Sequence, residues 1–115
     1  QWMSAIVCYL DVHAIRQIGS PFFFAMRRGE AFEPPPAAME ALEHDLTILE
    51  AALAHGPFLG GDAPNLADCL LAPIINALAL MPQTQPMLYM RPALTGFLAA
   101  VHARPFAEGV LKKPA

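Results

Sequence analysis

The sequence has little charge, and no cluster of one sign. Charged residues make up 15% of the 115, and 7 Lys and Arg against 10 Asp and Glu give a net charge of −3. The longest basic runs are the pairs Arg27-Arg28 and Lys112-Lys113. Because nucleic-acid binding depends on many phosphate contacts, we do not expect nucleic acid as a partner.

Cysteine is equally scarce. Cys8 and Cys69 lie in apolar helical contexts, and neither has a CxxC or CxxH partner. A zinc site and a disulfide are therefore not indicated, and no metal is expected. We expect two reduced thiols in the core of a cytoplasmic protein. Cys8 has no neighbouring base, which disfavours a nucleophilic role.

Strand signals and long hydrophobic runs are also missing. The only β-like run, Phe22–Phe24, does not alternate apolar with polar residues. The uncharged stretch after Asp68 is interrupted by Pro73, Asn76 and Pro82. Since a span needs about 20 continuous apolar residues, we expect no membrane segment.

Helical periodicity runs from end to end and predicts an all-α bundle of four to five main helices. The expected helices run over residues 2–26 with a break at 19–21, from the prolines at 34–36 to Gly56, over 66–81, from 91 to 104, and from 105 to 111. The helix over 66–81 is apolar on all sides, which predicts a buried central position. After it, residues 82–86 are expected to form a turn.

In the second helix, a leucine-rich stripe at steps of three and four residues predicts the core face: Met39, Leu42, Leu46, Leu49 and Leu53. Glu40, Glu43, His44 and Glu50 lie off this stripe, and we expect them to be solvated. Gly56 suits a left-handed helix end.

Apolar residues make up 56% of the chain, which is high for a self-contained soluble domain. The first residue is Gln1, and no helix start precedes Trp2. We therefore expect a piece of a longer protein, with a surface that a partner covers.

Asp68 stands at the start of the apolar central helix, where a carboxylate could be an acid, a ligand or a cap. Its three-residue offset from Asn65 is that of a reciprocal helix cap, in which each side chain bonds the other residue's N–H. No second carboxylate, His or Cys has ligand spacing to Asp68, so we favour the structural cap.

Three segments together resemble one known family. "FLGGDAPNLADCLLAP" (58–73), "RPALTGFLAAVHARPF" (91–106) and "QWMSAIVCYL" (1–10) are similar, in the same order, to the C-terminal helical domain of cytosolic glutathione S-transferases of bacterial type. The resemblance implies that residues 1–115 form that domain, without the thioredoxin-like N-terminal domain that binds glutathione and supplies the thiol-activating Ser, Tyr or Cys.

The resemblance further implies a role in glutathione conjugation or related thiol chemistry, as in detoxification. The chain would supply the wall of an apolar electrophile pocket and part of a homodimer surface, with no catalytic residue of its own and with glutathione as co-substrate. A second hypothesis is a non-catalytic interaction module of the same fold, as found in translation-factor and tRNA-synthetase complexes.

Tyr9, His13 and Arg16 are three or four residues apart, so a regular helix would place them on one face. In the resembled family this helix borders the electrophile pocket, which makes the three residues candidates for substrate binding. Tyr9 and His13 would orient glutathione or the electrophile, and Arg16 would attract a carboxylate. A polar face packed against the absent domain is the alternative.

Overall fold

The protein is all-helical over the part that the structure, a computed structural model, describes, residues 5–104. The elements are η1 (Ile6–Gly19), α2 (Ser20–Arg27), α3 (Pro36–Ala52), α4 (Leu66–Leu80), α5 (Gln85–Tyr89) and α6 (Pro92–His102). Over this range there is no strand, only an isolated bridge between Phe58 and Gly61. The all-α prediction is confirmed. Trp2 and the helix expected over 105–111 lie outside the described residues.

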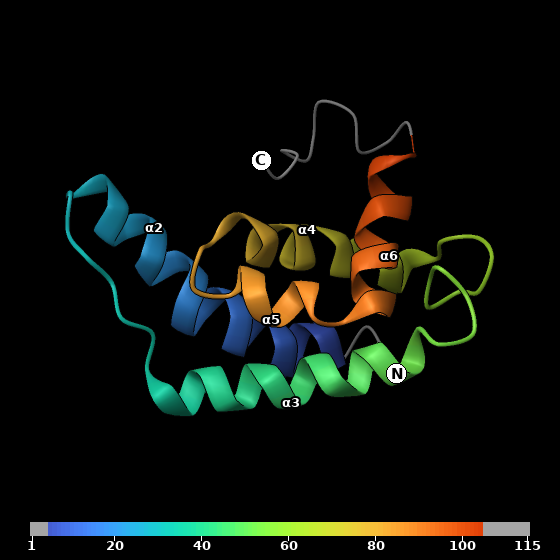
Figure 1. The fold of residues 1–115 in the computed structure, drawn as a ribbon, viewed down its shortest axis with the longest axis horizontal. Coiled ribbons are helices and arrows are strands. Elements are labelled where there is room, and N and C mark those ends of the chain that lie inside the picture. The colour runs from blue at the N-terminus through green and yellow to red at the C-terminus, as the bar shows by residue number, and fades with distance from the viewer. Residues whose placement is uncertain (1–4, 105–115) are drawn as a thin grey trace.

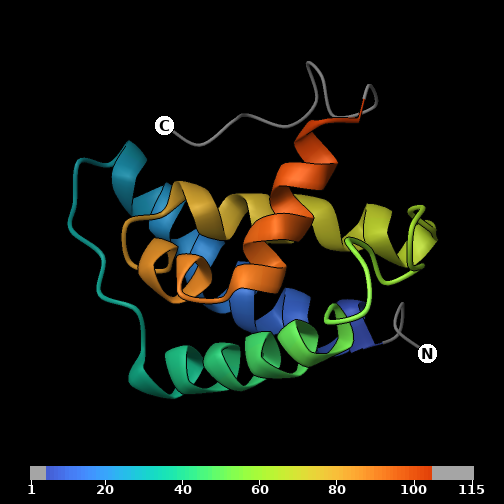
Figure 2. The same ribbon diagram turned by 45° about the vertical axis from the view of Figure 1, so that its right-hand side comes forward.

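The helices pack around one hydrophobic core. In Figure 1, α3 runs along one side of the molecule, and α6 stands across α4 and also packs against α3. The view in Figure 2 shows the same arrangement. η1 packs against both α3 and α4, while α4 also packs against α5 and α6. The helix over 66–80 is therefore central, as predicted. None of the described helices has the length and hydropathy that crossing a bilayer requires.

η1 is a π-helix of 14 residues, a form that proteins seldom use beyond a single turn. Its buried apolar side chains recur at every fourth position: Ile6, Leu10, Ala14 and Ile18. Arg16 Nε donates to Asp11 Oδ2 over 3.3 Å, a five-residue separation that matches π rather than α spacing. At Ser20 the chain continues as an α-helix, with Pro21 in its first turn. The predicted break at residues 19–21 is thus a change of helix type.

α4 is central but is not buried on every side. The prediction of a buried helix is therefore wrong for one face of α4. Leu66 is 61% exposed, and Cys69 and Pro73 are exposed beside it. Spacings of three and four residues place these three on one face, which no described element covers. Cys8 is exposed too, so the prediction that both thiols lie in the core is wrong. The reason is the same for both: an apolar neighbourhood in sequence does not fix which face of a helix is covered.

Asn76 of α4 is a satisfied polar group in the core. It is 4% exposed. Its side-chain Oδ1 lies 2.7 Å from Nε2 of His102, so the ring nitrogen donates across from α6. The pair joins the central helix to α6, as expected for a buried amide.

In α3 the leucine stripe is buried as predicted, from Leu42 to Leu53, with Met39 partly buried at its start. The prediction for Glu50 is wrong. Its carboxylate accepts from the backbone N–H of Ala93 (2.8 Å) and of Leu94 (2.9 Å). Since α6 begins at Pro92, Glu50 caps that helix from α3 and helps to hold the two helices together.

Two further local predictions differ from the structure. Gly56 does not have a positive φ, since Gly29 and Gly61 are the described glycines that do. A Cβ on Gly56 would instead lie 3.0 Å from the carbonyl oxygen of Gly61, so close approach of the backbone explains the glycine. After α4, the expected turn includes the start of a short helix, α5. There the Thr84 hydroxyl donates to the carbonyl of Leu78 over 2.7 Å.

Candidate functional site

Asp68 is the most buried carboxylate of the described residues, with 1% of its surface exposed. Its Oδ1 accepts from the N–H of Leu59 (2.6 Å), and its Oδ2 from those of Gly60 (3.1 Å) and Asn65 (2.9 Å). In return, Asn65 Oδ1 accepts from the N–H of Asp68 over 3.2 Å. Both hydrogen bonds of the cap that the spacing predicts are therefore present.

The loop before α4 folds around this carboxylate because its sequence permits a tight turn. Phe58 and Gly61 exchange two backbone hydrogen bonds of 3.1 and 3.0 Å, and Gly61 has a φ of +96°. A Cβ on Gly60 would lie 2.6 Å from the carbonyl oxygen of Ala63. The turn aims the N–H groups of Leu59 and Gly60 at Asp68, so that with Asn65 both carboxylate oxygens accept hydrogen bonds. This geometry gives Asp68 the structural role of a helix cap.

Among residues 5–104, no group of three or more His, Cys, Asp or Glu side chains is arranged to hold a metal ion.

A groove between η1 and α3 offers space for a ligand. Its volume is about 260 Å³, and its lining is mostly apolar: Ala5, Ile6, Tyr9, Leu10, His44, Asp45, Ile48 and Leu49. Tyr9 is 63% exposed and Ile48 is 47% exposed, although both are large side chains. Exposed apolar groups beside a concave surface are typical of a site that another molecule covers.

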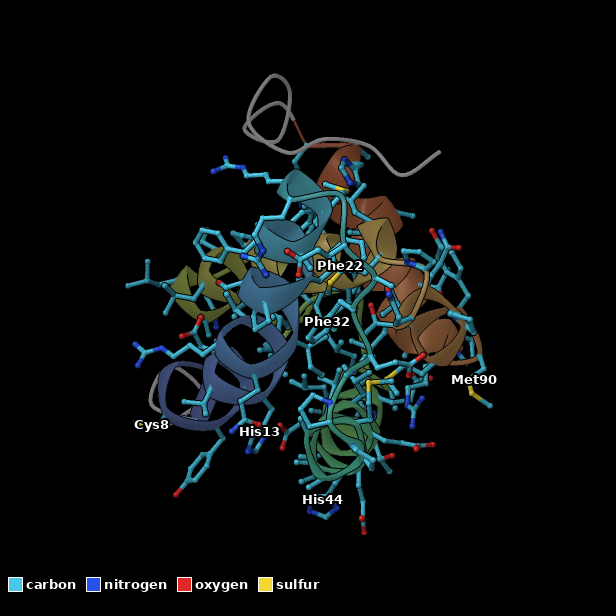
Figure 3. The ribbon with its side chains drawn as sticks, turned by 90° about the vertical axis from the view of Figure 1, so that its left-hand side faces the viewer. Cys8, His13, Phe22, Phe32, His44 and Met90 are labelled. Atoms are coloured by element: carbon cyan, nitrogen blue, oxygen red, sulfur yellow. The ribbon has the colours of Figure 1, made fainter. Side chains whose placement is uncertain are left out.

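Among residues 5–104, His13 and Asp45 form a hydrogen-bonded link between the side chains of η1 and α3. His13 Nδ1 lies 2.5 Å from Asp45 Oδ2, with the side chains 25% and 16% exposed. In Figure 3, His13 lies on the side of η1 toward α3, whereas Cys8 lies on the opposite side and His44 points outward. Because Asp45 also lines the groove, it connects His13 to that space.

The three candidate substrate-binding residues are distributed unevenly around the groove. Tyr9 belongs to its lining, and His13 is attached to it through Asp45. Arg16 is not among the lining residues; its side chain is 73% exposed and bonds to Asp11. The π-helix contributes to the separation of Arg16 from His13, because residues three positions apart do not lie on the same face of a π-helix.

Asp45 is the site residue that the sequence did not single out. It comes 32 positions after its partner, so no local motif joins the two. A weak signal exists, because Asp45 follows Leu42 by three residues and precedes Leu49 by four. These steps place the carboxylate at the edge of the buried stripe rather than on the solvated face.

Comparisons with known proteins agree with one another. The sequence model of the glutathione S-transferase C-terminal domain matches residues 30–104. A crystal structure of glutathione transferase F7 from Populus trichocarpa superposes with a TM-score of 0.72 at 27% identity, over 90% of this chain and 49% of that one. A structure of glutathione S-transferase III in its apo form superposes with a TM-score of 0.74 at 25% identity, over 99% of this chain and 54% of that one. No curated protein matches.

The chain thus spans about half the length of the solved structures that it matches. The matched family domain begins in the connection before α3 and continues through α6, so it includes the cap at Asp68 and the α3 side of the groove. The chain belongs to the glutathione S-transferase C-terminal domain family.

Proposed function

We propose that this chain is the helical domain of a glutathione transferase that conjugates glutathione to apolar electrophiles or runs related thiol chemistry. The observation that carries the proposal is the fold: a family match over residues 30–104, and superposition on about half of two glutathione transferases. A thioredoxin-like domain, encoded before Gln1, would complete the enzyme.

The groove suits the electrophile better than it suits glutathione. Glutathione carries two carboxylates, and the described lining of the groove contains no Arg or Lys to pair with them. The lining instead includes a carboxylate, Asp45, which would repel those of glutathione. The tripeptide would therefore be bound mainly by the other domain, as co-substrate, while this domain offers apolar surface.

On the η1 side, Tyr9 would form part of the wall of the electrophile pocket, and His13 would be joined to that wall through its hydrogen bond with Asp45. A mostly apolar wall excludes water and strengthens the interactions made inside it, and fixed orientation brings the thiolate and electrophile together. His13 and Tyr9 add the polar groups that orient a substrate. Arg16 would act only at longer range, by attracting a carboxylate from solution.

On the α3 side, we infer a homodimer surface that includes Ile48. This side chain is 47% exposed at the edge of the groove, and covering it with a second copy would remove apolar surface from water. We also expect a cytoplasmic location, where the exposed thiols of Cys8 and Cys69 would stay reduced.

Glutathione-dependent conjugation of an apolar aryl halide tests the proposal. The longer protein should catalyse it, and this chain alone should not. In the longer protein, His13→Ala should lower turnover. A longer protein that carries a thioredoxin-like domain and neither binds glutathione nor catalyses conjugation would favour the interaction module instead.

A further inference from the structure

We propose that Asp45 is a positioning residue for His13: it keeps the imidazole proton on Nδ1 and leaves Nε2 as a hydrogen-bond acceptor for a thiol or hydroxyl beside the groove. The proposal deepens the function inferred for the η1–α3 surface, and the class of ligand that it assigns to Nε2 rests on that proposed function. The assignment of the proton rests only on the contact between the two side chains.

The direction of the hydrogen bond follows from the chemistry of the pair. An ionised carboxylate has no proton to give, so at 2.5 Å the Nδ1 of His13 must be the donor and Asp45 Oδ2 the acceptor. A neutral histidine in water carries its proton mainly on Nε2. Asp45 therefore selects the tautomer that is in the minority in solution, and the lone pair is left on Nε2.

The surrounding helices hold both side chains in place. His13 follows buried Leu10 and precedes buried Ala14 on η1, while Asp45 precedes buried Leu46 on α3. The pair is thus anchored to two packed helices rather than to loops, and such support gives a defined ring orientation. The orientation is imposed by a contact across the fold and not by the helix that carries the histidine.

The second nitrogen remains available. Within residues 5–104 the imidazole of His13 has no hydrogen-bond partner other than Asp45, and 25% of the side chain is exposed. An acceptor on a ring that is bonded to the groove lining through Asp45 suits a ligand that carries one S–H or O–H donor. It does not suit a carboxylate, because the neighbouring Asp45 would repel that group.

Nitrogen-15 NMR of the histidine rings in this chain tests the assignment directly. In mildly alkaline buffer, so that neutral rings are observed, His13 should show the pattern of a protonated Nδ1. His44 and His55 are internal references, because both are exposed and neither has a ring hydrogen bond among the described residues. They should show the pattern of a protonated Nε2.

Asp45→Asn is the informative variant. An amide can donate to Nδ1, so the His13 proton should move to Nε2 while the other rings stay unchanged. Asp11→Asn, on the same helix, is the matched control and should leave His13 as it is. The amide spectrum reports whether each variant is folded.

Two results would overturn the proposal: a wild-type His13 protonated on Nε2, or an unchanged tautomer in folded Asp45→Asn. If that variant does not fold, the wild-type pattern decides alone. None of these readouts involves glutathione, so failure of the tautomer assignment is distinct from failure of the proposed function.

Discussion

Two carboxylates, Asp68 and Asp45, have opposite kinds of partner. Asp68 is 1% exposed and accepts three backbone N–H groups, from residues no more than nine positions away. Asp45 has a side chain that is 16% exposed, and it accepts from one side chain 32 positions away. Backbone donors fix a loop and hold the carboxylate in one position. A single side-chain partner next to a groove leaves a pair that can still take part in binding.

The largest expected effect is that of Asp68→Ala. The variant leaves three backbone N–H groups without their acceptor, two in the loop before α4 and one at its N-cap, Asn65, and so removes a helix cap. Because unsatisfied buried donors cost about 1–3 kcal/mol each, we expect a loss of about 3 kcal/mol in the free energy of unfolding, measured by urea denaturation of this chain.

Asp62→Ala is the control, since Asp62 lies in the same loop and is exposed. It should change the stability by no more than about 0.5 kcal/mol. If the two substitutions have equal effects, Asp68 does not hold the loop as described.

A smaller effect on stability is expected for the pair of His13 and Asp45. The coupling free energy between His13 and Asp45, from a double-mutant cycle with alanine at each position, should be about 1 kcal/mol, because the pair is partly solvated. Urea denaturation of the four proteins gives the value. A coupling near zero would mean that the contact between His13 and Asp45 is not formed in solution. Asp45 would then have no side-chain partner to compare with the backbone partners of Asp68.

The smallest effect should be that of Arg16→Ala. Arg16 is 73% exposed, and its bond to Asp11 is a surface ion pair within one helix. Such pairs contribute little, so the free energy of unfolding should stay within about 0.5 kcal/mol of the wild-type value. A larger loss would show that the ion pair stabilises the π-helical form of η1.

The sequence predicted those features that depend on neighbours along the chain. The cap at Asn65 and Asp68, the leucine stripe of α3 and the proline-led start of α6 all arise from fixed short offsets. The family resemblance rested on the same local segments. The residue patterns and the family resemblance together were therefore sufficient to predict the fold.

Features that depend on packing between helices were missed. Glu50 looked solvated because its partners, the N–H groups of Ala93 and Leu94, lie more than 40 positions later. Asp45 was overlooked for the same reason. The exposed stripe at Leu66 and Cys69 went unnoticed because composition does not tell which face of an apolar helix is covered. The π form of η1 also has no local signature in the sequence.

The most direct test of the account is a paired assay of this chain and of the longer protein proposed to contain it. Glutathione-affinity retention and conjugation of an apolar aryl halide are measured on both, under the same conditions. We predict that the longer protein is retained and active, and that the 115-residue chain is neither. Tight retention of this chain alone would contradict the account, because the described groove lining contains no Arg or Lys to pair with the carboxylates of glutathione.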